Sequence, residues 1–117
     1  MPEWRRLALN WKELAILLEK WKTILSQWRG IYFILDEEDG KGYVGAADGK
    51  ENMLHRWLEY SKSGHGGNKL LRSRKPDKFN FRVLELVAQS TENDQVQAIE
   101  ASWKDRLHTR TCGLNEN

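Results

Sequence analysis

Glu100 is the residue of this sequence whose position most needs a chemical explanation. It lies in a segment whose apolar residues recur at helical spacing: Val96, Ile99, Trp103 and Leu107. Glu100 falls on the same stripe, four residues after Val96 and three before Trp103. A carboxylate that faces inward loses hydration, which costs free energy unless it is paired or binds a cation. Both a buried salt bridge and a metal ligand fit this pattern, and the pattern alone favours the salt bridge.

Arg56 and Tyr60 form a second combination that could do chemistry. They are four residues apart, so in a helix they share one ridge beside its apolar stripe. A forked guanidinium suits phosphate oxygens. The alternative is an ordinary surface arginine, which is common. The same helical spacing predicts that His55 is more exposed than this pair, so His55 is not a candidate site residue.

Positive charge is concentrated between residues 62 and 82, although the net charge of the chain is only +2. Asp77 is the only acid in that stretch, whereas residues 36–39 read DEED. A basic stretch attracts a polyanion through counterion release, but a solvated loop explains the same residues. The candidate nucleic-acid contacts are Lys62, Lys69, Arg72, Arg74 and Lys75.

The composition is that of a soluble, globular chain with one domain. Its 117 residues are enough for one compact domain and too few for two ordinary ones. The longest apolar run is far short of a membrane span, and the first residues lack the pattern of a secretory signal. Cys112 is the only cysteine, which excludes an internal disulfide and a cysteine-based zinc site, and the cytoplasm is the expected location.

The elements that position these residues begin with a helical arm at residues 1–28. Apolar residues recur there at three- and four-residue steps, which predicts one bent helix or two short ones. The arm holds four of the six tryptophans, and helical spacing explains most of them as core or interface residues. The tryptophan-rich arm is also expected to contact a second copy of the chain or a partner chain.

Residues 29–117 form the second unit, for which we expect an α+β fold. GIYFIL at 30–35 and GYVGA at 42–46 predict two strands joined by a polar turn. A helix is predicted at 51–60, ended by the glycines of 63–67, with one further helical turn at 68–74. The sheet is therefore expected to be small and antiparallel, packed with helices.

The third strand and the last helix complete this prediction. The strand is expected at 79–87, with alternate residues on one face: Phe79, Phe81, Val83 and Val87. Glu85 interrupts the strand and is expected to be structural, paired with a basic residue. Thr91 opens the helix with Asp94 as its capping partner, and the helix runs to about Leu107.

Two tripeptides add a resemblance to a known family. GIY at residues 30–32, followed by YVG at 43–45, resembles the paired signature of the GIY-YIG nuclease superfamily. The later marks of that family follow in order: Arg56 on the first helix, Tyr60 one turn later, Glu100 on a later helix and Asn115 near the C-terminus. The resemblance covers about residues 29–117. It implies a three-stranded antiparallel sheet flanked by helices, and an endonuclease that hydrolyses phosphodiester bonds in DNA.

The resemblance also implies a metal ion. Glu100 would hold a single divalent cation, Mg²⁺ or Mn²⁺, while waters and the scissile phosphate complete the shell. This arrangement suits Mg²⁺, which keeps several waters and uses few protein carboxylates. Several relatives carry a lysine just after the second tripeptide where this chain has Ala46, and Lys50 is a candidate to replace it.

The other matched residues receive roles through the same resemblance. Tyr32 would be the general base that activates the attacking water; an unperturbed tyrosine pKa is about 10, so it needs help from the metal, a neighbouring cation or both. Arg56 would stabilise charge developing on the phosphate. Tyr43 and Tyr60 would position water and phosphate. Asn115 would clamp the site, with Asn117 as its competitor for that role.

Three functions remain open at this point. The first is an active DNA endonuclease. The second is a DNA-binding module without catalysis, which predicts loss of the glutamate or the arginine, and both Glu100 and Arg56 are present. The third is an interaction protein whose arm binds another chain, with or without nuclease activity.

Overall fold

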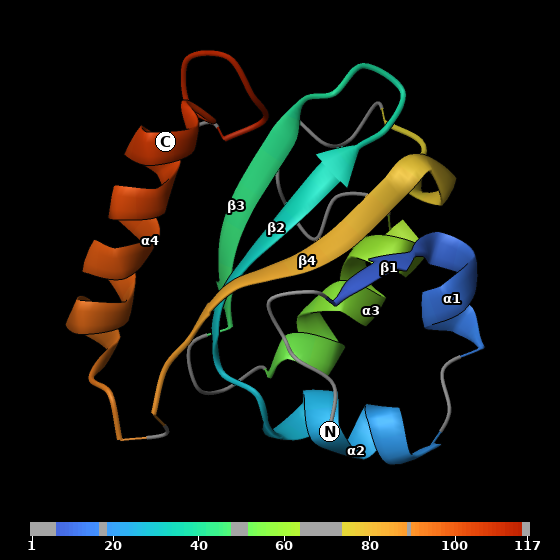
Figure 1. Cartoon of the computed structure of the whole chain (residues 1–117), viewed down its shortest axis with the longest axis horizontal. Helices are drawn as coiled ribbons and strands as arrows, with labels where there is room; N and C mark the ends of the chain where they lie inside the picture. The colour runs from blue at the N-terminus through green and yellow to red at the C-terminus, as the bar shows by residue number, and fades with distance from the viewer. Residues whose placement is uncertain (1–6, 17–18, 48–51, 64–73, 89, 116–117) are drawn as a thin grey trace.

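The computed structural model describes residues 7–16, 19–47, 52–63, 74–88 and 90–115 (Figure 1). In chain order its elements are β1 (Ala8–Asn10), α1 (Trp11–Ala15), α2 (Glu19–Gln27), β2 (Gly30–Asp36), β3 (Gly42–Ala47), α3 (Met53–Ser63), the 3₁₀ turn η3 (Pro76–Lys78), β4 (Phe79–Leu86) and α4 (Asn93–Leu107). Among these described residues, no helix is long and apolar enough to cross a membrane. The expected turn at 68–74 lies outside them, except for Arg74.

The sheet is antiparallel, as expected, but it has four strands instead of three, in the order β1-β4-β2-β3. The additional strand is β1, where the sequence predicts a helix. Asn10 explains the difference, because its side chain accepts a hydrogen bond from the Glu13 amide at 2.8 Å and its own amide donates to the Glu13 carboxylate. This capping box starts the helix at Trp11, so the residues before it stay extended and pair with β4.

The described residues between 7 and 28 share the core of the rest of the chain. Leu14 of α1, Leu25 of α2 and Trp28 are buried against the sheet. The helical part consists of two short helices, one of the two arrangements predicted. The side chains of Trp11 and Trp21, and all of Trp4, lie outside the described residues. The division of the chain into an arm at 1–28 and a domain at 29–117 stays a prediction.

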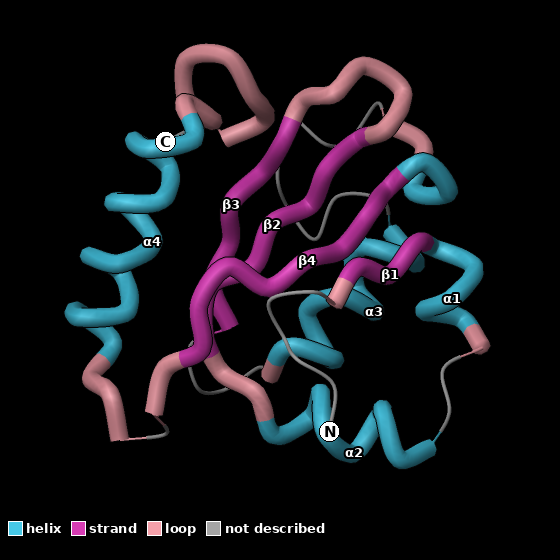
Figure 2. The backbone as a smooth tube through the Cα atoms, in the orientation of Figure 1, coloured by secondary structure: helices cyan, strands magenta, loops and turns pink. Residues whose placement is uncertain are grey.

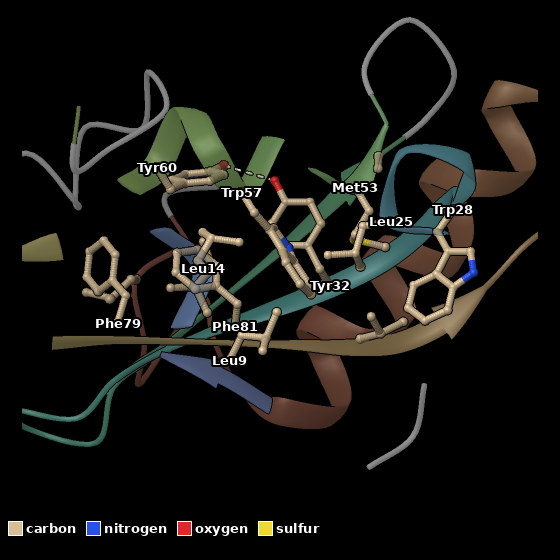
Figure 3. Close-up of a cluster of buried hydrophobic side chains, with 14 residues drawn as sticks. Leu9, Leu14, Leu25, Trp28, Tyr32, Met53, Trp57, Tyr60, Phe79 and Phe81 are labelled. Carbon is tan, nitrogen blue, oxygen red and sulfur yellow. Dashed lines mark hydrogen bonds between the residues drawn. The ribbon is translucent and has the colours of Figure 1, made fainter. Parts of the chain in front are cut away.

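The two faces of the sheet carry separate apolar clusters. On one face α1, α2 and α3 cover the larger cluster, whose side chains include Phe79 and Phe81 of β4 and Trp57 of α3 (Figure 3). On the other face α4 covers a smaller cluster built on Val44 and Val96. Figures 1 and 2 show α4 beside β3, away from the three other helices. The sheet therefore separates α3 from α4, and β3 is one of its two edge strands.

A bulge in β4 corrects the predicted alternation of the third strand. Phe79, Phe81 and Val83 face the larger cluster as expected. Ile31 then pairs with Glu85 while Tyr32 pairs with Val83, so β4 holds an additional residue at this point. The bulge reverses the alternation, and Val87 packs on the α4 side of the sheet instead. A strict two-residue period cannot anticipate such an insertion.

The last helix begins later than predicted. Its N-cap is Glu92, and its side chain makes no capping hydrogen bond, so the predicted opening at Thr91 with Asp94 as partner is wrong. The Asp94 carboxylate accepts from the neighbouring Gln95 amide instead. Leu107 is also not part of the inward stripe, because 39% of it is exposed at the end of the helix.

Candidate active site

Tyr32, Tyr60 and Arg56 meet in one hydrogen-bonded cluster. Tyr32 lies on β2, and its hydroxyl is 3.0 Å from the hydroxyl of Tyr60 on α3 (Figure 3). Arg56 lies one helical turn before Tyr60; it donates from Nη2 to the Tyr60 hydroxyl at 2.9 Å and from Nε to the Tyr32 hydroxyl at 3.4 Å. The predicted ridge of Arg56 and Tyr60 therefore faces the first-strand tyrosine of the GIY tripeptide.

The glycine of the YVG tripeptide makes room for this cluster. Gly45 pairs with Tyr32 across the sheet, and a Cβ atom at Gly45 would overlap the Tyr32 ring and hydroxyl. Gly30 has a similar reason, since a Cβ there would overlap the backbone carbonyl of Glu85. Both glycines of the signature thus permit close approach of a neighbouring strand or ring. Because Gly45 has to lie opposite Tyr32, the register of the β2–β3 hairpin determines how far apart the two tripeptides lie in the sequence.

Tyr43 lies next to the cluster on β3. It is half-buried, and its ring centroid is 5.8 Å from that of Tyr60, which in turn makes an edge contact with Tyr32 at 5.9 Å. The guanidinium of Arg56 also lies 5.2 Å from the centre of the Tyr60 ring. Three tyrosines and one arginine therefore form a continuous group on the α3 side of the sheet.

Burial controls the electrostatics of the two central tyrosines. Neither Tyr32 nor Tyr60 exposes surface. Burial raises the pKa of Tyr32 well above its ordinary value, and nearby Tyr43 adds to the rise. The Arg56 guanidinium and the Tyr60 hydrogen bond act in the opposite direction without overcoming burial. Burial raises the pKa of Tyr60 as well, so both hydroxyls keep their protons at neutral pH.

Glu100 lies apart from this cluster, on α4 and therefore on the other side of the sheet. Its carboxylate pairs with the ammonium of Lys104, one turn later, at 3.6 Å. This is the salt bridge that the sequence pattern alone favours. The Glu100 side chain is nevertheless 20% exposed, as is that of Arg56. Both charged side chains therefore reach solvent, whereas Tyr32 and Tyr60 are fully buried.

The carboxylate of Glu100 is compatible with a magnesium site of the open kind. Among the described residues, no three or more His, Cys, Asp or Glu side chains gather closely enough to hold a metal ion. An all-protein cage is therefore not formed by this part of the chain. Mg²⁺ does not need one, because it binds through one or two carboxylates and keeps waters and substrate phosphates as its other ligands.

Asn115 joins the C-terminal tail to β3. Its side-chain carbonyl accepts from the Val44 amide at 2.8 Å, and its side-chain amide donates to the Val44 carbonyl at 2.9 Å. The Leu114 amide donates to the Gly42 carbonyl at 2.8 Å. The tail therefore satisfies backbone groups of Gly42 and Val44 on the edge strand. This geometry is that of a clamp, while any part of Asn115 in catalysis stays a prediction.

Only some of the predicted nucleic-acid contacts fall among the described residues. Lys69, Arg72 and the side chain of Lys62 lie outside them, and Lys75 is exposed. Arg74 donates to Asp36 at 3.0 Å and to Asp39 at 2.6 Å, and both hydrogen bonds raise its pKa. It thus connects the start of the basic stretch to the acidic DEED turn. A phosphate at Arg74 would have to compete with two carboxylates.

Arg29 is a residue that the sequence reasoning overlooked. It is 6% exposed, and its guanidinium donates to the carbonyls of Ala88 and Thr91 and, at 2.9 Å, to the side chain of Asn93. It therefore connects the start of β2, which carries Tyr32, to the start of α4, which carries Glu100.

Glu85 and Lys104 also differ from the sequence-based expectation. Within the part of the chain that the structure describes, Glu85 has no basic partner; it accepts a hydrogen bond from the Trp103 indole at 3.0 Å instead. Lys104 is only 9% exposed, although its residue type is typical of a surface. It follows Glu100 by four residues, a spacing that could have indicated the pairing.

Replacing Arg29 is expected to destabilise the fold. Arg29→Met should lower the free energy of unfolding by about 2–4 kcal/mol, because the carbonyl groups of Ala88 and Thr91 lose a buried, charged donor. Urea denaturation would measure the change. The matched control is Arg82→Met, since Arg82 is exposed on β4 and donates to Asn80. A loss no greater in Arg29→Met than in Arg82→Met would contradict the role assigned to Arg29.

Comparison with known proteins decides the family. Residues 29–113 match the model of the GIY-YIG catalytic domain. The chain belongs to the GIY-YIG family. This family membership supports a nuclease function, and the match begins one residue before the GIY tripeptide.

Solved structures agree with this assignment. The chain is similar to a mutant of the catalytic domain of the intron endonuclease I-TevI, with 26% identity over 78% of this chain and 95% of that one, at a TM-score of 0.59. It is also similar to the catalytic domain of the homing endonuclease I-TevI, with 28% identity over 74% and 96% of the two chains, at a TM-score of 0.55. Among the curated proteins compared, none matches the sequence.

Proposed function

We propose that this GIY-YIG domain is a metal-dependent DNA endonuclease, with Tyr32, Arg56 and Glu100 as its principal catalytic residues. The observation that carries the proposal is the position of Arg56. Its guanidinium contacts the hydroxyls of both Tyr32 and Tyr60, and its side chain is still 20% exposed. One group can thereby contact a phosphate and the proposed base at the same time. The endonuclease relatives and the basic residues between 62 and 75 support DNA as the substrate.

Arg56 would stabilise the negative charge that develops on the phosphate during attack. Its side chain is held before the substrate arrives, because Tyr60 and Glu59 fix two of its nitrogens, at 2.9 and 3.3 Å. A guanidinium fixed in this way loses little freedom when it meets the phosphate oxygens. Tyr60 is accordingly proposed to position Arg56 and Tyr32, since its own hydroxyl is buried.

Tyr32 would take the proton of the attacking water. In the structure its hydroxyl donates to Tyr60 and accepts from Arg56. Once Tyr32 is ionised, its oxygen can accept from both groups, and both contacts then favour the anionic form. Burial opposes ionisation, so Tyr32 is neutral at rest. The active form therefore has to be generated as the substrate binds or by raising the pH. We propose that Tyr43 packs beside this pair and orders the water.

Glu100 would hold one Mg²⁺ or Mn²⁺ ion. When bound, such an ion supplies positive charge to phosphate oxygens. Arg56 and Glu100 lie on opposite sides of the sheet, and β3 is the edge between them. We therefore propose that the DNA strand to be cut crosses the β3 edge, close to the segment that Asn115 clamps.

Plasmid cleavage tests the proposed function. Supercoiled plasmid incubated with the protein and Mg²⁺ should be converted to nicked or linear forms, and EDTA should prevent this. Glu100→Gln should lose most of the cleavage, because a neutral amide is a much weaker ligand for Mg²⁺ than a carboxylate. Glu92→Gln is the matched control, since Glu92 is an exposed glutamate at the start of the same helix. Absence of cleavage by the wild-type protein would favour a non-catalytic DNA-binding module.

A further inference from the structure

The pair formed by Glu100 and Lys104 differs from an ordinary salt bridge on a helix surface. In a typical pair of this kind both side chains lie in water and contribute little. Here the side chains of Lys104 and Glu100 are only 11% and 20% exposed. Lysine is seldom buried to this degree unless its ammonium is paired. The ammonium is thus held against the carboxylate that we assign to the metal ion.

The neighbouring residues explain why the lysine stays there. Val96 is buried on the inner face of α4, and Ile99 and Trp103 of the same helix pack against the same cluster. The aliphatic stem of a lysine can pack along such apolar surface while its head group stays at a polar partner. Since Glu100 and Lys104 are four residues apart on one helix, the ammonium remains within reach of the carboxylate.

We propose that Lys104 occupies the position of the metal ion on Glu100 in the DNA-free protein, so that ammonium and divalent cation compete for one carboxylate. The inference rests on the proposed function, because it takes Glu100 as the metal-binding group. Two positive charges on the same carboxylate repel each other, so binding of the ion must displace Lys104. The displaced ammonium would then be available to donate to a phosphate oxygen of the substrate. Metal affinity is therefore low until DNA is present.

Mn²⁺ binding measured without DNA tests the competition directly. Electron paramagnetic resonance of free Mn²⁺ would give the dissociation constant for the wild-type protein and for Lys104→Met. The variant should bind Mn²⁺ about 5- to 10-fold more tightly, since loss of one partly buried competing charge is worth about one power of ten in affinity. Lys104→Arg keeps the charge and should resemble wild type. Lys12→Met removes an exposed lysine of α1 and should change nothing.

The outcomes of the Mn²⁺ measurement distinguish the competition by Lys104 from the assignment of Glu100 to the metal ion. Tighter binding in Lys104→Met together with weaker binding in Glu100→Gln supports the inference. Unchanged or weaker binding in Lys104→Met, with Glu100→Gln still impaired, overturns the inference and leaves the metal assignment intact. Unchanged Mn²⁺ affinity in Glu100→Gln overturns both the competition by Lys104 and the assignment of Glu100 to the metal ion. Thermal unfolding confirms that each variant is folded, and Lys104→Gln replaces the methionine variant if the latter is not.

Discussion

Arg56→Ala is expected to reduce the single-turnover rate of DNA cleavage by a factor of about 10²–10³. The variant removes the only group in the described site that contacts both tyrosine hydroxyls and also reaches solvent. The loss should appear mainly in the rate at saturating DNA, because stabilisation of developing charge acts in the transition state. Binding of DNA should weaken far less than the rate falls.

Two further variants make the Arg56 prediction specific. Arg56→Lys keeps the charge but cannot contact both hydroxyls through one planar group, so most of the loss should remain. Arg82→Ala, which removes an exposed arginine on β4, should cleave at nearly the wild-type rate. Full activity in Arg56→Lys would show that charge alone is sufficient, and activity in Arg56→Ala close to wild type would contradict the assignment.

Tyr32→Phe is expected to reduce the rate by a factor of about 10²–10⁴ and to remove much of its dependence on pH. Burial raises the pKa of Tyr32 above the ordinary value of about 10. Below that raised pKa the ionised fraction increases tenfold with each pH unit. If the ionised form is the base, the logarithm of the wild-type rate should rise with pH between about 7 and 9 with a slope near one.

Rate profiles over this pH range would check the assignment of Tyr32. Tyr60→Phe is the matched comparison, because it removes the hydrogen bond that lowers the pKa of Tyr32 but leaves Tyr32 in place. Its rate should fall while the slope persists. A wild-type slope that survives in Tyr32→Phe would assign the base to another group.

Much of the fold followed from local patterns. The hairpin of β2 and β3 was predicted from two apolar runs around a polar turn, and α3 from its apolar stripe. The ridge of Arg56 and Tyr60 was also predictable, because residues four apart on a helix are neighbours. These features depend on spacing within one element or between adjacent elements.

The remaining features depend on contacts between distant parts of the chain. Strand β1 exists because β4 offers a pairing edge, and the bulge in β4 depends on its register with β2. Arg29 acts on carbonyl groups about sixty residues away. Burial of the tyrosine hydroxyls is likewise a property of packing. A single sequence carries no direct signal for such long-range contacts.

The edge strand β3 gives the site its most consequential geometry. The tyrosine and arginine cluster lies on the α3 side, and Glu100 lies on the α4 side. Val44 packs beneath α4, and the adjoining residues Tyr43 and Gly45 pack toward α3. Asn115 holds the backbone of Val44, so the tail fixes the element that separates the two halves. The proposal requires both halves to act on one phosphate.

A double-mutant cycle of Tyr32→Phe and Glu100→Gln tests this requirement most directly. Single-turnover cleavage of a DNA duplex in saturating Mg²⁺ would be measured for wild type, both single variants and the double variant. If both residues serve one reaction, the double variant should be no more than about threefold slower than the slower single variant, because groups that act as a unit are strongly non-additive. Losses that multiply in the double variant would show that Tyr32 and Glu100 act independently, and would contradict a single active site across β3.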